Sequence, residues 1–471
     1  MRAYVYLVVG GMYLTRRLLT YPLPDGRWLL INTLSGAIDI IAPAVAEALK
    51  QLLQNERVSL DPAIETRLRE RGYLFDNPAH EDRRFQELFS TMMERRKREP
   101  VQFAICPTYS CNLRCTYCFE GDLTAGPLRA MSPEQVRNAF VAIETIRRER
   151  HPGANAHLIL FGGEPLMRPV KPCVALILQE AELRGFGVGV VTNGVQIEDF
   201  LDLLLPKKRL IRQIQVTIDG PQEVHDRRRP FKSGRGSFSR IVRSVEVLLQ
   251  EGLPITIRIN VDRENISSLP NLMAYLEDCG WTLYPNFSCY IFPVTAYTDS
   301  NQTGILAEDE VLSELQRMFG GVGGQMPGFA LYGFKVLGHV ASVLNPSSLP
   351  LRMPPLFTYC EANGLRYFAF GPDGLIYPCG QGVGRQPLAI GRFHPVFELW
   401  EDRCALWERR SVLTVPQCQS CPLATLCGGG CAFGAWVRTG SLMEPNCQGS
   451  PQVLDRYIDR MISHIMHLAP M

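Results

Sequence analysis

Hydrophobic and polar positions change their pattern near residue 101, where strand periods begin to alternate with helical ones. Before that point, residues 27–42 predict two strands around a polar turn, and residues 45–53 follow with helical spacing. A second short helix is expected at 64–72, and another strand near 73–75. This order of elements is winged-helix-like and predicts a separate small domain at the N-terminus.

After residue 101, apolar strand candidates alternate with amphipathic helix candidates. Strands are expected at 101–108, 157–165, 187–194, 214–220, 255–262 and 287–292, and helices at 133–149, 173–183, 197–205, 238–250 and 269–280. Six such repeats predict an α/β fold, a partial (β/α)6 TIM-like barrel around a parallel sheet. Polar and glycine clusters follow several strands. Because sites in such barrels gather at the carboxyl ends of the strands, these clusters predict one shared pocket.

Composition narrows the class of protein. The net charge is +2, from 49 basic and 47 acidic residues, which disfavours a nucleic-acid partner or an acidic membrane surface. The apolar stretch at 3–14 is far shorter than the ~20 residues that span a bilayer, so we expect a strand there, no membrane partner and a cytoplasmic location. In a reducing cytosol, clustered thiols hold metal more often than they form disulfides, and ten of the fifteen cysteines fall into two groups.

The first group is a trio of cysteines in an eight-residue stretch: Cys111, Cys115 and Cys118. A helical stripe would place them on one face, but the polar residues between them make a poor core face. A structural zinc site would need a fourth Cys or His close by, which neither Phe119 nor Glu120 supplies. The remaining option is an iron–sulfur cluster held by three cysteines, which leaves one iron free for a non-protein ligand.

The sequence CNLRCTYCFE at 111–120, after the first barrel strand, resembles the CxxxCxxC motif of radical S-adenosylmethionine (SAM) enzymes, including the aromatic Tyr117. The resemblance implies a [4Fe-4S] cluster whose open iron is chelated by the amino and carboxylate groups of S-adenosylmethionine. It also implies that the reduced cluster releases methionine and a 5′-deoxyadenosyl radical, which abstracts a hydrogen atom. The motif would then lack a fourth cysteine because the fourth iron has to stay open for S-adenosylmethionine.

Other barrel motifs resemble the same family in order. Gly162, Gly163, Glu164 and Pro165 resemble its GGEP turn, which meets the methionine amino group. Strand-end positions that resemble those facing the nucleoside or substrate are Thr192, Asn193, Thr217 and Asp219. Arg229, the last residue of HDRRR, resembles the arginine of an HDxxR motif that holds the methionine carboxylate. Taken singly, each motif is also compatible with a plain turn or a solvated surface.

The second cysteine group comprises Cys360, Cys379, Cys418, Cys421, Cys427, Cys431 and Cys447. Seven thiolates exceed one tetrahedral site, so two centres are expected if all bind metal, and paired zinc knuckles are one possibility. The spacing resembles the SPASM domain of radical SAM enzymes, which implies two auxiliary [4Fe-4S] clusters. By that resemblance the first is held by Cys360, Cys379 and Cys431, and the second by Cys418, Cys421, Cys427 and Cys447. Residues 361–367 lack the further cysteine that some members have, which leaves one iron open to substrate or to Cys404.

These patterns predict three domains: a winged-helix-like, leader-peptide recognition domain at 1–98, the barrel at 99–345, and a Cys-rich iron–sulfur domain ending in a helix at 346–471. SPASM-bearing enzymes mostly act on peptides or proteins, and the N-terminal domain resembles the peptide-recognition domain of such maturases.

We therefore expect a maturase of ribosomally made peptides. It would install a cross-link or related oxidative modification on a precursor peptide, with a reductant such as flavodoxin or ferredoxin. The alternatives are an anaerobic sulfatase-maturating enzyme that makes formylglycine, a non-catalytic iron–sulfur electron carrier, and a zinc-binding interaction module. No general base is predicted from the sequence.

Overall fold

The computed structural model describes residues 12–54, 56–295, 297, 304–320, 330–344 and 355–470. The chain divides into two compact units. Unit 1 comprises Met1–Arg96, Lys335–Cys360 and Arg410–Met471, and unit 2 comprises Lys97–Phe334 and Glu361–Arg409. The three-domain division stays a prediction. Most of the strand expected at 3–14, and the boundary expected at 345/346, lie outside the described residues.

Unit 2 is built on one sheet of eleven strands in the order β12-β11-β10-β9-β8-β7-β6-β13-β14-β15-β16. Its centre consists of β6 (Val101–Ile105), β7 (Ala156–Leu160), β8 (Val188–Thr192), β9 (Ile211–Thr217), β10 (Ile255–Val261) and β11 (Phe287–Pro293). These six strands pair in chain order, and every pair is parallel. The predicted α/β fold with a parallel sheet is therefore confirmed.

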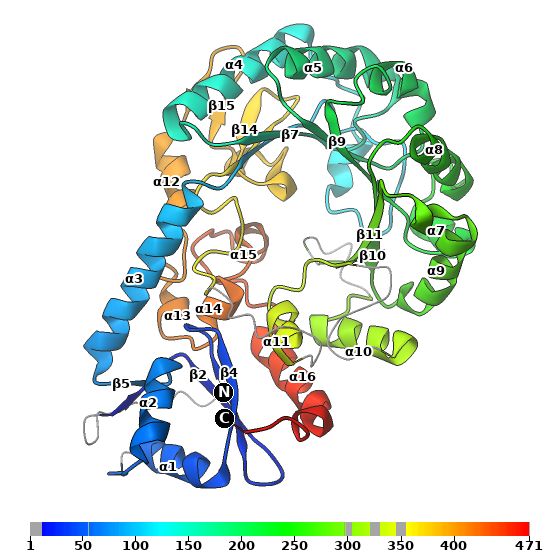
Figure 1. Cartoon of the computed structure of the whole chain (residues 1–471). Coiled ribbons are helices and arrows are strands. Elements are labelled where there is room, and N and C mark those ends of the chain that lie inside the picture. The colour runs from blue at the N-terminus through cyan, green and yellow to red at the C-terminus, as the bar shows by residue number, and fades with distance from the viewer. Residues whose placement is uncertain are drawn as a thin grey trace. The chain divides into compact units, whose positions relative to one another are not determined.

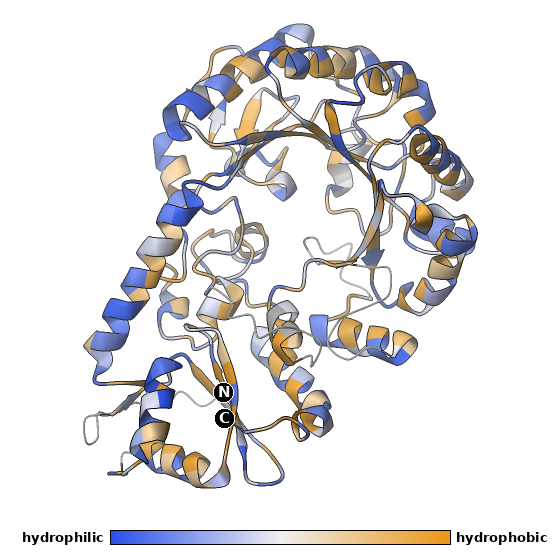
Figure 2. Ribbon diagram, in the orientation of Figure 1, coloured by the Kyte–Doolittle hydropathy of each residue, from blue (hydrophilic) through white to orange (hydrophobic). Residues whose placement is uncertain are grey.

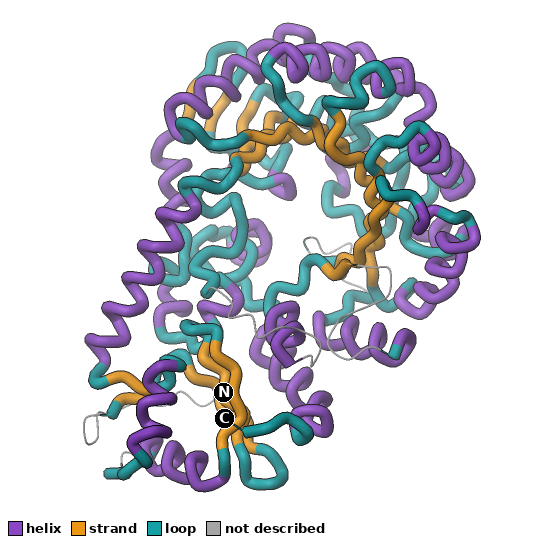
Figure 3. Tube along the Cα trace, in the orientation of Figure 1, coloured by secondary structure: helices purple, strands orange, loops and turns teal. Residues whose placement is uncertain are grey.

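Helices cover the outer side of this curved sheet (Figures 1 and 3). They are α4 (Pro133–Arg150), α5 (Lys171–Leu183), α6 (Leu201–Leu204), α7 (Gln222–Arg228), α8 (Phe238–Gln250) and α9 (Leu269–Asp278). The apolar stripe of α8, including Ile241, Val245 and Leu248, is fully buried, as expected for an amphipathic helix packed on a sheet. The helix expected at 197–205 is instead a 3-10 turn, Ile197–Phe200, followed by the short α6.

The sheet extends beyond the six predicted strands at both edges. At one edge, β12 (Ala330–Leu331) pairs parallel with β11, and α10 (Glu308–Phe319) precedes it. At the other, β13 (Tyr367–Phe370) pairs parallel with β6, and β14 (Leu375–Tyr377), β15 (Gly391–Arg392) and β16 (Glu398–Leu399) follow antiparallel, before α12 (Glu401–Arg409). Residues 361–409, expected in the third domain, thus continue the barrel sheet.

The N-terminal part of unit 1 has the predicted strand and helix order. An antiparallel sheet is formed by β2 (Leu18–Pro22), β3 (Trp28–Asn32) and β4 (Ala37–Ile41), followed by α1 (Pro43–Leu53) and α2 (Pro62–Glu70). β5 (Leu74–Phe75) pairs with β1 (Tyr13–Leu14). Leu30, Leu49 and Leu68 form the centre of the core between these elements. The helix α3 (Pro78–Arg96), which carries the charged run before the barrel, is largely hydrophilic (Figure 2).

The C-terminal part of unit 1 carries most of the second cysteine group. Its helices are α11 (Leu337–Leu344), α13 (Pro416–Gln419), α14 (Ala424–Cys427), α15 (Ala432–Thr439) and α16 (Ser450–Ile465). Leu34 and Phe85 from the N-terminal part share one core cluster with Phe357, Val412 and Cys418. The N-terminal part and the cysteine-bearing loops of unit 1 therefore pack against each other. Within the described residues, every helix is too short or too polar to cross a membrane.

Candidate active site

The first cysteine trio lies in an irregular loop directly after β6, so the helical-stripe interpretation of Cys111, Cys115 and Cys118 is wrong. The backbone N–H groups of Arg114 and Thr116 donate to Pro230 O and Arg228 O at 2.8 and 2.9 Å. These two hydrogen bonds hold the loop against the last residue of α7 and the segment that follows it. All three thiols are half-buried and none is in a disulfide. Burial raises the pKa of Cys115 to about 11, with Arg229 acting in the opposite direction.

The donor set fits a cluster rather than a single ion. In the part of the chain that the structure describes, no three His, Cys, Asp or Glu side chains converge on one metal ion. A [4Fe-4S] cluster does not require such convergence, because each thiolate binds a different iron. Three free thiols on one loop, next to the buried cation of Arg229, are suited to holding an anionic cluster with one iron open.

The GGEP turn after β7 packs directly against the chain that enters the cysteine loop. The backbone N–H groups of Gly163 and Glu164 donate to Thr108 O and Ser110 O at 3.2 and 2.9 Å. Gly162 has φ +129°, and a Cβ on Gly163 would collide with the carbonyl oxygens of Tyr109 and Ser110. Only glycine permits this approach of two strand ends.

The Glu164 carboxylate is 1% exposed and fully engaged. It accepts hydrogen bonds from the Thr192 hydroxyl at 2.6 Å, from the Asn193 backbone N–H at 2.6 Å and from the Leu166 backbone N–H at 2.8 Å. Burial raises the pKa of this carboxyl, and the three hydrogen bonds oppose the rise. The Asn193 side chain also lies 3.7 Å from Cys111 Sγ. The predicted residues Glu164, Thr192 and Asn193 are thus brought together beside the cysteine loop, and Pro165 is buried behind them.

A second network surrounds Tyr117, the aromatic residue of the cysteine motif. Its hydroxyl donates to the Asp219 carboxylate and accepts from Arg229 Nη1 at 2.6 Å and from Asn260 Nδ2 at 3.1 Å. The guanidinium groups of Arg228 and Arg229 lie 4.9 and 6.0 Å from the centre of its ring. Burial raises the pKa of Tyr117 well above its ordinary value. Asp219 and Arg229, both predicted, therefore meet at the cysteine loop.

Three residues of this network were missed from the sequence. Arg228 is buried, and its guanidinium binds the Asp262 carboxylate at 2.6 Å and lies 3.6 Å from Asp219. Asn260 donates its backbone N–H to Asp219 Oδ1 at 2.9 Å. The sequence did hold a signal for two of them, because Asn260 and Asp262 lie at the carboxyl end of a predicted strand, where other site residues also gather.

The second cysteine group is divided between the units. Cys379 belongs to unit 2, whereas Cys360 and Cys431, predicted with it for one cluster, belong to unit 1. The four thiols predicted for the other cluster are close enough to influence one another: burial raises the pKa of Cys427 to about 12, and Cys418, Cys421 and Cys447 add to the rise.

Two arginines of unit 1 lie close to these thiols or to the backbone that carries them. Arg410 is 2% exposed, and burial lowers its pKa, while the neighbouring thiols of Cys418, Cys431, Cys360 and Cys427 act in the opposite direction. It donates to Gly429 O and Gly430 O, both at 3.2 Å. Arg17, between β1 and β2, donates to Gln419 O at 2.8 Å and to Cys421 O. The sequence reasoning did not identify either arginine.

Cys404, the alternative ligand considered from the sequence, is fully buried in unit 2. Its thiol donates to Ile390 O at 3.7 Å, and burial raises its pKa to about 11. Its role as a ligand stays a prediction.

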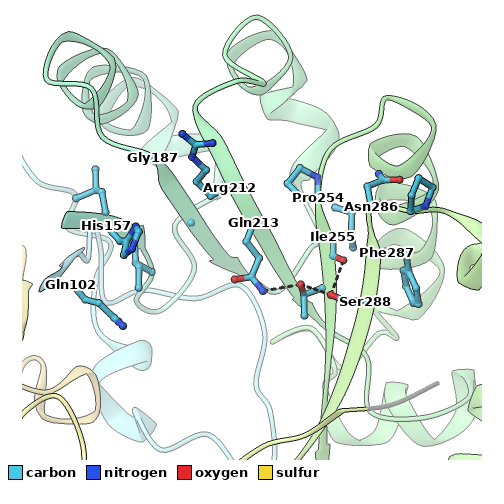
Figure 4. Close-up of a pocket in the computed structure, with 15 residues that line it drawn as sticks. Gln102, His157, Gly187, Arg212, Gln213, Pro254, Ile255, Asn286, Phe287 and Ser288 are labelled. Atoms are coloured by element: carbon cyan, nitrogen blue, oxygen red, sulfur yellow. Dashed lines mark hydrogen bonds between the residues drawn. The ribbon is translucent and has the colours of Figure 1, made fainter. Parts of the chain in front are cut away.

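Two cavities lie away from the cysteine loop. In unit 2, a cavity of about 620 Å³ opens at the amino-terminal ends of the barrel strands (Figure 4). In its wall, Gln213 Nε2 donates to Thr256 Oγ1 at 2.7 Å, and Thr256 Oγ1 lies 2.8 Å from Ser288 Oγ. In unit 1, a cavity of about 740 Å³ is lined by apolar and arginine side chains, among them Leu34, Leu74, Phe75, Phe357, Arg69, Arg84 and Arg95.

Comparison with known proteins gives a family for the barrel. The pattern of the radical SAM superfamily matches residues 105–276. An AdoMet-dependent heme synthase of Methanosarcina barkeri is 24% identical over 350 residues, which cover 72% of this chain and 94% of that protein. A serine-type anaerobic sulfatase-maturating enzyme of Bacteroides thetaiotaomicron is 27% identical over 206 residues, covering 42% and 48% of the two chains.

Among solved structures, native anSMEcpe with bound AdoMet and Cp18Cys peptide superposes with a TM-score of 0.55. The match covers 78% of this chain and 99% of that chain. Because the two sequences are only 19% identical, the match indicates a shared fold and nothing more.

Proposed function

We propose that this chain, whose residues 105–276 match the pattern of the radical SAM superfamily, modifies a ribosomally made precursor peptide. A reduced [4Fe-4S] cluster, when bound, would supply the electron that cleaves S-adenosylmethionine to methionine and a 5′-deoxyadenosyl radical, which removes a hydrogen atom from the peptide. The product would carry a cross-link or a related oxidative modification. A cytoplasmic reductant such as flavodoxin or ferredoxin would deliver the electron.

The observation that carries the radical chemistry is the buried Glu164 carboxylate beside the cysteine loop. Three hydrogen bonds hold it as an acceptor, which suits it to bind the ammonium group of S-adenosylmethionine. Arg229 Nε is buried and lacks a hydrogen-bond partner among the described residues, so it can receive the methionine carboxylate. Cys111, Cys115 and Cys118 would hold the cluster between these two charges.

Two features of unit 1 support a peptide substrate. The sheet β2-β3-β4 has β2 and β4 at its edges, and an added peptide strand could pair with either of them. The nearby cavity of about 740 Å³ combines apolar walls with side chains of both charges, which suits a peptide bearing apolar and charged side chains. The shared core and the Arg17 contacts link this region to the loop of Cys418 and Cys421.

Auxiliary clusters are part of the proposal. Cys418, Cys421, Cys427 and Cys447 would hold one of them, and Cys360, Cys379 and Cys431 the other. The buried cation of Arg410 next to several of these thiols favours anionic clusters there. Such clusters would accept the electron left on the peptide after hydrogen removal.

The test uses the anaerobically reconstituted enzyme and a short peptide encoded beside its gene. We expect deoxyadenosine formation, and a peptide product that has lost the mass of two hydrogens. Cys115→Ala should abolish both, whereas Cys173→Ala, which changes a half-buried thiol on α5, should leave both unchanged. Deoxyadenosine formation that persists in Cys115→Ala would overturn the radical assignment. Formylglycine on a sulfatase, with every peptide unmodified, would overturn the peptide assignment.

A heme-forming reaction is the second candidate, because the Methanosarcina barkeri heme synthase aligns over 94% of its length. Conversion of a porphyrin by the reconstituted enzyme, with no change in any peptide, would favour it.

A further inference from the structure

Strands β9 and β10 carry polar side chains on the side of the unit 2 sheet that faces away from the helices, where β/α barrels usually pack branched apolar side chains. Strand β10 shows the alternation. Ile255, Ile257 and Ile259 are at most 1% exposed and face the helices. The positions between them, including Arg258 and Asn260, turn to the other side of the pleat. A polar inner face of this kind is suited to contact a ligand.

Arg258 is the only cation of β10, and it is half-buried. Its Nε donates to Asn260 Oδ1 at 2.8 Å, and its guanidinium lies 4.2 Å from the centre of the Phe292 ring. The neighbouring strand places Tyr290 directly beside it, and Tyr290 donates to Gln215 Oε1 at 2.7 Å. One arginine, one phenol and one amide therefore gather on the inner face of three adjacent strands.

Arg258 differs from Arg228 in its ionic partners. No carboxylate among the described residues forms an ion pair with it, whereas Arg228 has Asp262 and Asp219 within 4 Å. Guanidinium groups in partly buried positions normally bind carboxylates or phosphates through two parallel hydrogen bonds. The remaining Nη donors of Arg258 are therefore suited to an anionic group of a ligand.

Arg258 also lies close to the proposed chemistry. Asn260, its hydrogen-bond partner, donates from Nδ2 to the Tyr117 hydroxyl at 3.1 Å. Tyr117 lies between Cys115 and Cys118 in the cysteine loop. One side chain thus separates Arg258 from the loop that would hold the radical-forming cluster.

We propose that Arg258, with Tyr290 and Gln215, binds a carboxylate of the substrate peptide and so presents a neighbouring residue to the radical. The inference rests on the proposed function and adds to it a substrate requirement. The carboxylate comes either from an Asp or Glu side chain or from the C-terminus of the peptide.

The experiment measures equilibrium binding to the reconstituted holoenzyme with S-adenosylmethionine. The probes are acetylated, amidated Gly-Ser peptides whose central residue is Asp, Glu, Asn, Gln or Gly, and the Gly peptide with a free C-terminus. Coproporphyrin III, whose propionates offer the same chemistry, is the non-peptide probe. The variants are Arg258→Gln and Arg258→Lys. Arg243→Gln is the matched control, because Arg243 is exposed on α8 and pairs with Glu198.

We expect the wild type to bind one class of carboxylate peptide at least tenfold more tightly than its amide counterpart. Arg258→Gln should remove this preference, Arg258→Lys should keep part of it, and Arg243→Gln should keep all of it. Preference for Asp or Glu identifies a side-chain carboxylate, and preference for the free C-terminus identifies a terminal one.

Three results would overturn the proposal. In the first, the preference for a carboxylate peptide persists in Arg258→Gln. In the second, the wild type binds all peptides equally or binds none of them. In the third, Arg258 matters only for the binding of coproporphyrin III. Deoxyadenosine formation without peptide should change less than about twofold in Arg258→Gln, since a larger loss would place Arg258 on S-adenosylmethionine. Failure of the proposed function is separable, because the wild type would then form no deoxyadenosine or would leave every peptide unmodified.

Discussion

Replacing Glu164 by Gln tests the contact on which the radical assignment depends most. The carboxylate accepts two hydrogen bonds at Oε1, from Thr192 and Leu166, and one at Oε2, from Asn193. A glutamine has one acceptor oxygen and one NH2 group. The least costly orientation points the NH2 group at the Asn193 N–H, which loses one hydrogen bond and leaves two donors facing each other.

The cost can be worked from these contacts. A buried donor left without a partner costs about 1–3 kcal/mol. Loss of the negative charge also weakens the two hydrogen bonds that remain. It removes the ionic partner of the ligand ammonium as well, and a hydrogen bond between charged groups contributes about 1.5–3 kcal/mol. Because every 1.4 kcal/mol is about tenfold in affinity, the Kd for S-adenosylmethionine should rise about 10- to 100-fold.

The assay is anaerobic equilibrium dialysis of S-adenosylmethionine with the reconstituted enzyme. Iron content and the far-ultraviolet circular dichroism should match those of the wild type, because the cysteines are unchanged. Glu182→Gln serves as the control, since this glutamate is exposed on α5 and pairs with Lys207. If Glu164→Gln keeps its fold and its affinity for S-adenosylmethionine is unchanged, then Glu164 has only a structural role at the strand ends.

Three further predictions concern the surroundings of the site. In Gly163→Ala, the new Cβ would meet the carbonyl oxygens of Tyr109 and Ser110, so we expect the loss of one cluster's worth of iron; full iron content would contradict the steric argument. Arg410→Gln removes a buried positive charge beside the thiols, so the auxiliary reduction potentials measured by redox titration should become more negative, while Arg460→Gln, which changes an exposed side chain of α16, should not shift them. Burial, with Arg366 nearby, lowers the pKa of His151 from 6.5 to about 4, so the unfolded state binds more protons between these values and stability is lost as the pH falls through them. The loss should total about 3 kcal/mol of unfolding free energy over this pH range, and urea titrations of His151→Gln should lack it; an unchanged pH dependence would mean that other groups cause it.

Much of the barrel could be predicted because its signals are local. Runs such as 255–262 are apolar on alternate positions, and the helices between them have one apolar stripe, so strand and helix follow from periodicity alone. The cysteine loop, the GGEP turn and the strand-end residues Thr192, Asn193 and Asp219 were likewise readable, because parallel strands bring their carboxyl ends to one edge.

Other features depend on contacts between distant parts of the chain. The two-residue strands β12, β15 and β16 have no periodicity of their own and exist only because the sheet edge supplies hydrogen-bond partners. The pairing of β13 with β6 joins residues more than 250 positions apart, and it moved Cys379 into the barrel unit against the expected domain boundary. The core shared by Leu34, Phe357 and Cys418 arises in the same way.

For the site, the sequence by itself determined the residue types: three thiols on one loop, a carboxylate in a glycine turn, and the arginine that ends the HDRRR motif. Only the tertiary structure decided their partners. In the structure, Asp219 contacts Tyr117 and Asp262 pairs with Arg228, while no carboxylate of the described residues pairs with Arg258. The physical reason is that spacing along the chain sets which side chains reach one edge of the sheet, whereas charge pairing depends on distances of a few ångströms between strands.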